Sequence, residues 1–413
     1  MTNQINMGLE RMESLMEKLR HPERRVKTIH IAGTNGKGST TAFLMEVLKR
    51  SGLFVGTYTS PYWHSPAEQI SINGSQISAS ELRHCLGEIA PAIEETEKEL
   101  NTQVTEFEKM TTAALYFFST IKPVDLAIIE TGLGGREDAT NLIVPLVSII
   151  TNVDMDHEAW LGDNIRAISR EKAGIIKSGV PVVTGAEGEA LDILKEEAES
   201  RHSKLYGPGA AGKTEIRSIE TEQTVFDYTS SYQSLSSLKI TMKGEHQVTN
   251  AALALMALDY MKQYYAMMAD EEAIRDGLRE AQVPGRLETV SAEPLVVIDT
   301  AHNPAAVNAL CRTLKTIYPD RSFSVLFASM KDKNYTRMLS VLSESSASVT
   351  VTTFCDPRAA ETADLLQADV TAGQTDDPER WLYSQMSEQN EKTGILITGS
   401  QAFVGKMRAL LVK

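Results

Sequence analysis

Apolar and polar residues follow a strand–helix–strand rhythm near the start of the chain. Between Met7 and Leu19 the apolar residues recur every three or four positions, which predicts an amphipathic helix that ends before Pro22. The elements expected next are a strand at 28–31, a glycine-rich turn at 33–38, a helix up to about residue 50 and a strand near 53–58. This order is typical of the start of an α/β domain.

Later apolar runs predict buried strands that end in polar residues. Residues 124–129 lead into Glu130, and residues 147–150 lead into Thr151 and Asn152. Continuous apolar runs suit strands that are buried on both faces of a parallel sheet. Because ligands gather at the carboxyl ends of such strands, these polar residues indicate a candidate site.

The pattern weakens and then restarts, which indicates two domains. The serine- and threonine-rich stretch between about 187 and 243 predicts peripheral antiparallel strands and loops. Helices are expected near 247–260 and 271–280, and strands at 295–299, 323–327, 349–351 and 395–398. We therefore predict a mostly parallel, doubly wound α/β domain with peripheral strands over residues 1–290, and a smaller Rossmann-like α/β domain over residues 291–413. The cleft between them is the expected site.

Composition narrows the class of partner and the compartment. The 413 residues include 55 acidic and 41 basic side chains, and the formal net charge of -14 argues against a broad nucleic-acid surface. Cys85, Cys311 and Cys355 are far apart, which indicates free thiols in a reducing compartment. The first residues lack the pattern of a secretion signal, and the richest apolar stretch, 251–258, is too short to cross a membrane. We expect a cytoplasmic monomer that binds neither nucleic acid nor a membrane.

The turn after the first strand has the composition of a phosphate-binding loop. Residues 33–39 read Gly-Thr-Asn-Gly-Lys-Gly-Ser, so glycines let backbone N–H groups converge on an anion while Lys37 supplies a cation. The loop is not a strict Walker A match, because Gly38 separates Lys37 from the hydroxyl residue and position 31 is isoleucine. A tight connection without a ligand is the alternative. A lysine between glycines directly after a buried strand favours phosphate binding.

Three polar residues are expected at the same edge of the first sheet. Ser60 follows the second strand, Glu130 ends a later strand, and His157 follows another. The hydroxyl and the carboxylate suit Mg²⁺, whereas histidine is less usual for this ion and is as readily a surface residue. The glycine-rich loop from Glu130 to Arg136 is equally compatible with a flexible connection and with a loop that surrounds an anionic substrate.

Together these motifs resemble those of the folylpolyglutamate synthases and dihydrofolate synthases, which are relatives of the Mur ligases. The matching segments run in order along nearly the whole chain. They are residues 30–39, 58–61, 105–108, 130–141, 156–157, 170–177, 244–247, 250–252, 284–288, 299–304, 332–333 and 357–359.

The resemblance implies a Mur-ligase-like ATPase domain, followed by the smaller domain, and an ATP-dependent amide ligase. The ATP-binding residues that it implies are Gly33, Thr34, Asn35, Gly36, Lys37, Gly38, Ser39, Asn250, Arg286 and Asp299. The implied Mg²⁺ ligands are Ser60, Glu130 and His157, and the implied substrate-binding residues are Phe107, Arg136, Asp138 and His302. Lys37, Lys172 and His157 are expected to act in catalysis, and Lys172 matches the lysine that the family carbamylates.

The implied reaction adds L-glutamate to a folate. ATP converts a substrate carboxylate to an acyl phosphate, and the amine of glutamate then displaces phosphate. The acceptor is a reduced folate for the polyglutamate reaction and dihydropteroate for dihydrofolate synthesis. The motifs are common to both reactions and do not separate them.

Other classes fit the sequence less well. A Mur ligase acting on a nucleotide sugar usually has an additional N-terminal domain, and only about 25 residues precede the first strand here. A P-loop kinase or GTPase would not need the second α/β domain, and no Asn-Lys-x-Asp guanine motif is present. A non-catalytic nucleotide-binding regulator is disfavoured because the phosphate lysine and the expected metal ligands are all present.

The chain departs from the family pattern in one loop. Residues 66–70 read Pro-Ala-Glu-Gln-Ile where the family usually has an aromatic residue followed by Asn-Glu-Arg-Ile. That loop lies near the substrate in the family, so handling of the pterin or of glutamate is expected to differ. Thr300 stands where glycine is common, and Asn334 stands where aspartate is common. Neither belongs to the phosphate or metal set, so we expect activity to be retained.

Overall fold

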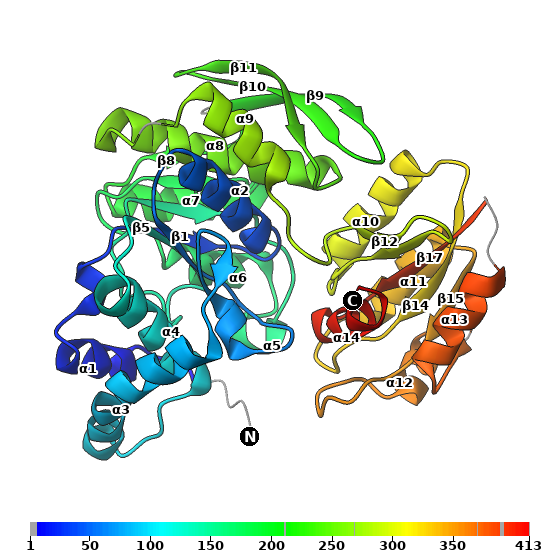
Figure 1. Ribbon diagram of the computed structural model, residues 1–413, viewed down its shortest axis with the longest axis horizontal. Helices are drawn as coiled ribbons and strands as arrows, with labels where there is room; N and C mark the ends of the chain where they lie inside the picture. The colour runs from blue at the N-terminus through cyan, green and yellow to red at the C-terminus, as the bar shows by residue number, and fades with distance from the viewer. Residues whose placement is uncertain (1–5, 210–211, 268, 370, 389–391, 413) are drawn as a thin grey trace.

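Two lobes make up the structure, which is a computed structural model that describes residues 6–209, 212–267, 269–369, 371–388 and 392–412. The larger lobe holds the elements from α1 to α9 and the smaller lobe those from β12 to α14 (Figure 1). The predicted α/β fold class, with mostly parallel sheets, is confirmed. No helix among the residues just given is long and apolar enough to cross a membrane. Residues 1–5, where no signal pattern was found, lie outside the described residues.

The central sheet of the first lobe has eight strands. They are β1 (Thr28–Ala32), β2 (Val55–Tyr58), β3 (Ile70–Ile72), β4 (Ser75–Gln76), β5 (Leu126–Glu130), β6 (Val147–Ile150), β7 (Val182–Thr184) and β8 (Leu205–Tyr206). Their order is β4-β3-β2-β5-β1-β6-β7-β8, with parallel pairing from β2 to β8 and an antiparallel edge formed by β3 and β4. The carboxyl ends of β1, β2, β5 and β6 therefore meet at one edge, as the sequence predicts.

Helices cover both faces of this sheet. Their bounds are α1 (Glu10–Lys18), α2 (Lys37–Arg50), α3 (Ala79–Leu100), α4 (Glu106–Tyr116), α5 (Glu158–Leu161), α6 (Ile165–Ala173), α7 (Gly188–Ser200), α8 (Glu245–Tyr265) and α9 (Glu271–Glu280). The helices α2, α8 and α9 bury one face, where Phe43 is fully buried. The helices α1, α3 and α4 bury the other face around Phe117 and Phe118. These apolar faces hold the sheet rigid and leave its polar edge for ligands.

The stretch between residues 187 and 243 is only partly as predicted. A three-stranded antiparallel sheet is present, formed by β9 (Gly212–Ile219), β10 (Thr224–Ser230) and β11 (Ser234–Ile240). The expectation of strands and loops throughout is wrong for residues 188–200, which form α7. The buried residues of α7 are Ala190, Ile193, Leu194 and Ala198. Their spacing puts them on one face of a helix, which covers the sheet beside β8.

The second lobe is built on a six-stranded sheet. Its strands are β12 (Glu288–Ser291), β13 (Val296–Ile298), β14 (Ser322–Phe327), β15 (Ser348–Val351), β16 (Gly373–Gln374) and β17 (Thr393–Thr398). Its helices are α10 (Pro304–Ile317), α11 (Tyr335–Ser345), α12 (Thr362–Ala368), α13 (Pro378–Glu388) and α14 (Gln401–Leu411). In this sheet only β12 is antiparallel to its neighbour, and the other pairs are parallel. The expected domain boundary after residue 290 falls within β12.

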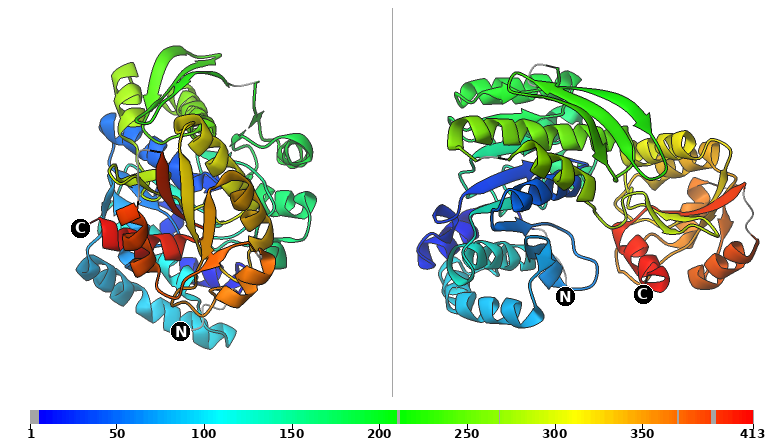
Figure 2. Two further views of the ribbon diagram at one scale, coloured as in Figure 1. Left: turned by 90° about the vertical axis from the view of Figure 1, so that its right-hand side faces the viewer. Right: turned by 45° about the horizontal axis from the view of Figure 1, so that its top comes forward.

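The two lobes touch on more than one side of the linker. The three-stranded sheet reaches toward the second lobe (Figure 2), where Ile219 packs against the apolar cluster that contains Val307 and Leu310 of α10. Lys243 donates a hydrogen bond to Thr289 at 3.1 Å. These contacts place the phosphate-loop edge of the first sheet opposite the second domain.

Candidate functional site

The loop before α2 is packed so closely that two of its glycines have no room for a side chain. Gly36 is the left-handed N-cap of α2, with a φ of 86°, and a Cβ atom there would lie 2.3 Å from Oδ1 of Asn250. A Cβ atom at Gly33 would lie 1.8 Å from Oγ1 of Thr151. The loop thus brings the start of α2 against β6 and α8, which places the expected ATP residues Gly33, Gly36 and Asn250 together.

Lys37 is the common neighbour of several other expected site residues. Its Nζ atom donates to the carbonyl oxygen of Gly33 at 2.9 Å and lies 3.9 Å from Oε1 of Glu130. Burial lowers the pKa values of His157 and Lys172, and the positive charge of Lys37 adds to both shifts, while it opposes the rise that burial causes in the pKa of Glu130. The structure therefore brings the other expected catalytic lysine, Lys172, and two expected metal ligands, Glu130 and His157, near the ammonium group of Lys37.

Glu130 is a buried carboxylate at the end of β5. Burial raises its pKa to about 7, while the charges of Lys37 and Arg286 and the backbone of Ser60 act in the opposite direction. Among the residues that the structure describes, no three His, Cys, Asp or Glu side chains form a ready-made metal centre. Ser60 and Glu130 nevertheless offer the oxygen ligands that Mg²⁺ prefers, and this ion takes its remaining ligands from phosphate and water. The donor set fits a nucleotide-bound metal.

Lys172 is buried on α6 and is partly discharged. Burial lowers its pKa to about 7, and Lys37 acts in the same direction, whereas Asp156, Asp138 and Asp154 oppose the shift. No side-chain hydrogen bond holds its ammonium group among the described parts of the chain. A buried amine of this kind is uncharged in a large fraction of molecules at neutral pH.

Asp156 joins the two domains. Lys333 lies 2.6 Å from its Oδ1 atom, and both side chains are less than one-tenth exposed. Nε2 of His302 lies 3.5 Å from Oδ2, and Asn303 donates to the same oxygen at 3.2 Å. Burial alone would raise the pKa of Asp156, but His302 and Lys333 hold it well below its usual range. Three residues of the second domain therefore converge on one carboxylate of the first.

His157 lies beside this interdomain pair. Burial and the charge of Lys333 lower its pKa to about 4, so the imidazole is neutral near pH 7. Its Nε2 atom is 3.2 Å from Nζ of Lys333 and accepts a hydrogen bond from that ammonium. A groove of about 280 Å³ passes here between the domains, lined by His157, Asn303 and Lys333 among others.

A second contact between the domains involves the phosphate loop directly. Asn303, the N-cap of α10, donates to Oδ1 of Asn35 at 2.9 Å, and Nδ2 of Asn35 donates back at 3.3 Å. The backbone N–H of Asn35 also donates to Asn152 at 2.8 Å, while Thr34 and Asp154 bond each other through side chain and backbone. The phosphate loop is thus braced from both domains.

Arg286 and Asp299 lie where the linker enters the second sheet. Within the described parts of the chain, the Nε atom of Arg286 is buried and has no hydrogen-bond partner, so it is a donor that could bind an anion. Asp299 accepts N–H groups from Leu287 and Ala301, each at 2.8 Å. Burial raises the pKa of Asp299, and Arg286 opposes this. The charge of Arg286, which follows the linker turn, also acts to lower the pKa of Glu130 in the first domain.

The expected substrate residues do not all lie in one place. Phe107, at the start of α4, packs so closely that a Cβ atom at Gly132 would lie 2.4 Å from its ring. Asp138 is buried and uses its oxygens on the backbone of Leu133 and on Thr140, which holds the glycine-rich loop in shape. His302 faces Asp156, as described above.

Arg136 is not brought to the group around Lys37. Its guanidinium donates to the carbonyl oxygen of Arg170 at 3.2 Å, lies 3.9 Å from Glu197 of α7, and is 42% exposed. In the structure Arg136 connects the glycine-rich loop to the helices that follow, and the substrate-binding role that the family resemblance implies for it stays a prediction.

Lys333, Asn303 and Asp156 are site residues to which the sequence analysis gave no role. Each lies in a matched segment, at 332–333, 299–304 and 156–157. Their positions within the family motifs were the one feature of the sequence that could have indicated that they belong to the site. The contacts that define their roles join residues 147 and 177 positions apart, so no local spacing could reveal them.

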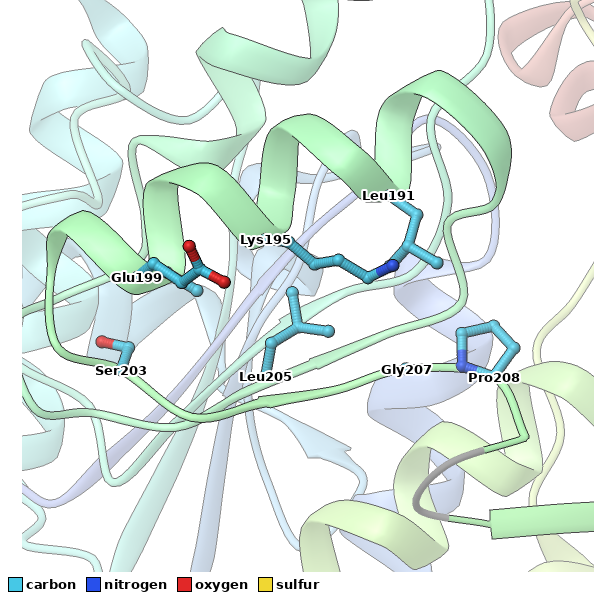
Figure 3. Close-up of a pocket in the computed structure, with 8 residues that line it drawn as sticks. Leu191, Lys195, Glu199, Ser203, Leu205, Gly207 and Pro208 are labelled. Carbon is cyan, nitrogen blue, oxygen red and sulfur yellow. The ribbon is translucent and has the colours of Figure 1, made fainter.

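A separate cavity of about 330 Å³ lies between α7 and the segment around β8 (Figure 3). Leu191, Lys195 and Glu199 project from the helix toward Leu205 and Pro208. None of the lining residues belongs to the site around Lys37. This cavity therefore contributes nothing to the candidate site.

Comparison with known proteins covers both domains. Residues 31–258 match the Mur ligase middle domain, and residues 285–401 match the Mur ligase glutamate ligase domain. A dihydrofolate synthase/folylpolyglutamate synthase of Bacillus subtilis (strain 168) is 37% identical over 98% of this chain and 95% of the relative.

Two solved structures are similar over nearly the full length. Folylpolyglutamate synthase of Mycobacterium tuberculosis complexed with ADP has a TM-score of 0.92 at 31% identity, covering 99% of this chain and 96% of that one. A bifunctional folylpolyglutamate synthase/dihydrofolate synthase with Mn, AMPPNP and L-glutamate bound has a TM-score of 0.88 at 31% identity, covering 99% and 95%. The chain belongs to the folylpolyglutamate synthase and dihydrofolate synthase family of Mur ligases.

Proposed function

We propose that this protein is an ATP-dependent ligase that adds L-glutamate to reduced folates, and that it also joins glutamate to dihydropteroate. The observation that carries the proposal is the convergence of Lys37, Glu130 and Arg286 at the interdomain face of the phosphate loop. Two cations and one carboxylate, with Lys37 at a helix N-terminus, suit a nucleoside triphosphate with a divalent metal. Family membership supports the same assignment.

In this proposal ATP lies across the phosphate loop. The N–H groups of residues 33–39 and the Lys37 ammonium bind phosphate oxygens, and the unpartnered Nε of Arg286 donates to the nucleotide. Asn250 supports the loop at Gly36, and Asp299 completes the site from the second domain. Ser60, Glu130 and His157 would hold Mg²⁺, which offsets negative charge on the phosphates. The lowered pKa of His157 keeps its imidazole neutral near pH 7, and to bind the metal Nε2 would exchange the hydrogen bond that it accepts from Lys333.

Lys172 is proposed to be carbamylated. Only an uncharged amine reacts with carbon dioxide, and a lysine with a pKa near 7 supplies one at neutral pH. The amine nitrogen bonds to the carbon of CO2 and releases one proton to solvent, and the resulting carbamate carries a negative charge that the neighbouring Lys37 stabilises. Lys172→Ala should lose turnover, and added propionate should restore part of it by supplying a carboxylate to the vacated space. Failure of every small carboxylate to restore turnover, with nucleotide binding intact, would count against carbamylation.

The reaction follows from how these groups hold the reactants. The acceptor carboxylate attacks the γ-phosphorus of ATP, ADP leaves, and the acyl phosphate forms while Lys37 and Arg286 stabilise the phosphoryl oxygens. The glutamate amine then attacks the acyl carbon, phosphate leaves, and a proton is lost from the nitrogen. Phe107 is the proposed contact for the pterin ring, while His302 beside Asp156 is the proposed contact for glutamate. Contact between the domains excludes water that would hydrolyse the acyl phosphate.

The test is phosphate release by purified protein with ATP, Mg²⁺ and L-glutamate, with tetrahydrofolate or dihydropteroate added in separate reactions. Both acceptors are expected to stimulate release, and stimulation by only one would restrict the protein to a single activity. Lys37→Ala should abolish turnover with either acceptor. Lys49→Ala is the matched control, because Lys49 lies on the same helix and pairs with Glu46 at the surface. Absence of stimulation by both acceptors would refute the assignment.

A further inference from the structure

The segment just before residues 66–70, which depart from the family pattern, inserts a tryptophan between the two domains. Trp63 follows Ser60 by three positions and is half-buried. A Cβ atom at Gly285 of the linker would lie 3.0 Å from Cζ2 of its ring, and a Cβ atom at Gly405 of α14 would lie 3.1 Å from Cγ. The indole therefore lies against two glycines of different elements, both outside the first sheet, and each approach depends on the missing side chain.

A charged pair holds this contact from the side of the second domain. The guanidinium carbon of Arg408 lies 5.6 Å from the centre of the Trp63 ring, a cation–π distance. Arg408 donates to both oxygens of Glu288 at 2.9 to 3.0 Å, and Glu288 also accepts the N–H of Gly285 at 2.7 Å. Trp63 thus rests on a linker turn that Glu288 and Arg408 hold in one conformation.

The loop that carries Trp63 is itself well ordered by hydrogen bonds. The carboxylate of Glu68 accepts the backbone N–H groups of Trp63, His64 and Ser65 at 2.9 to 3.0 Å. The carbonyl oxygen of Pro61 accepts a hydrogen bond from Gln401 of α14 at 3.4 Å. Glu68 and α14 therefore hold the short segment that joins Ser60 to Trp63.

Both ends of this contact reach the phosphate site. Ser60, three residues before Trp63, lies beside Glu130. Arg286 directly follows Gly285 and carries the buried Nε atom that has no partner among the described residues. Its charge also acts to lower the pKa of Glu130. Trp63 therefore connects the segment that carries Ser60, a proposed metal ligand, to the linker turn that carries Arg286, a proposed nucleotide ligand.

We propose that Trp63 is a positioning residue that ties the orientation of the second domain to the placement of Ser60 and Arg286 at the nucleotide. This inference rests on the proposed nucleotide site and assigns a role to a residue outside the family motifs. Without the indole, the linker turn and the loop after Ser60 move independently. Fewer molecules then have both residues in place, and nucleotide binding weakens.

The experiment measures equilibrium binding of Mg²⁺·AMPPNP by calorimetry, which requires no acceptor, together with kcat and KM for ATP. Trp63→Ala should raise Kd and KM for the nucleotide roughly tenfold, the scale of coupling between residues in contact. Trp63→Phe keeps a ring against both glycines and should restore most of the affinity. Tyr62→Ala is the matched control, because Tyr62 is its neighbour in the chain and is 45% exposed.

Gly405→Ala distinguishes a positioning role of Trp63 from a merely structural one. In the wild type the new methyl group meets the Trp63 ring, so Kd for Mg²⁺·AMPPNP should rise severalfold although alanine favours the helix. In the Trp63→Ala background the same change should have no effect. Equal effects of Gly405→Ala in both backgrounds, or unchanged binding by Trp63→Ala, would overturn the proposal. A wild type that binds nucleotide but releases no phosphate would instead refute only the proposed function.

Discussion

The ion pair between Arg11 and Glu108 makes a sharp prediction about the first domain. Nε of Arg11 lies 2.9 Å and 3.1 Å from the two oxygens of Glu108, and the side chains are only 9% and 3% exposed. Glu108 also accepts the backbone N–H and the hydroxyl of Thr105, which caps α4. The pair thus fixes the N-terminal helix to the helix that carries Phe107.

Arg11→Met keeps most of the side-chain volume but removes the charge. Breaking a buried ion pair by removing one partner costs about 3–5 kcal/mol, because the remaining charge stays buried. Glu108 retains its two hydrogen bonds from Thr105, so we expect the lower end, about 3 kcal/mol. For a domain of this size that lowers Tm by roughly 5 °C. Adding Glu108→Gln removes the stranded charge and keeps the helix cap, so the double variant should recover to within ~1 kcal/mol of the wild type.

Urea unfolding followed by far-UV circular dichroism measures these differences in the free energy of unfolding. The order expected is wild type, then the double variant, then Arg11→Met. The reasoning is refuted if Arg11→Met lies within ~0.5 kcal/mol of the wild type, the range of ordinary surface substitutions. It is also refuted if the double variant is no more stable than the single one.

Three further predictions concern pH, the phosphate loop and the domain contact. Burial lowers the pKa of His30 to about 3, so between pH 6.5 and pH 3 the unfolded chain binds a proton that the folded one does not. Stability is therefore lost as pH falls, and from pH 7 to pH 5 the wild type should lose ~2 kcal/mol more than His30→Gln in urea unfolding; parallel profiles would contradict this. Gly36→Ala, whose Cβ atom would meet Asn250, should abolish nucleotide binding in calorimetry without loss of circular dichroism; retained binding would show that the loop tolerates a side chain. Lys333→Ala leaves the carboxylate of Asp156 without its cation, so small-angle X-ray scattering should show a larger radius of gyration; an unchanged radius would mean that the ion pair does not hold the domains together.

Most of the fold follows from local pattern. The strand that ends at Ala32 and the helix that follows it were predictable because a buried apolar run, a glycine-rich turn and a helical period occur in succession. The helix at 188–200 was missed although Ile193 and Leu194 follow Ala190 at helical spacing, since the serine and threonine content of the stretch as a whole favoured strands. Composition averaged over a long stretch concealed a short periodic signal.

The site divides along a similar line. The phosphate loop was predictable because its glycines, its lysine and the helix start are consecutive in the chain. The direction of Arg136 was not predictable, because it depends on where α6 and α7 pack. The meeting of Lys333 with Asp156 depends on how two domains dock, and no spacing within either domain encodes that.

The backbone at Leu287, in the linker, couples the orientation of the domains to ligand binding at Asp299. Leu287 has a left-handed backbone, with a φ of 46°, which costs a non-glycine residue roughly 1–2 kcal/mol. Its N–H donates to Asp299 at 2.8 Å, a hydrogen bond of similar worth. A ligand that competes for the Asp299 carboxylate would therefore remove the hydrogen bond that offsets the strain of this corner, and relief of the strain would let the linker turn. By reciprocity, any partner or substitution that favours one angle changes the affinity of that ligand by the same factor.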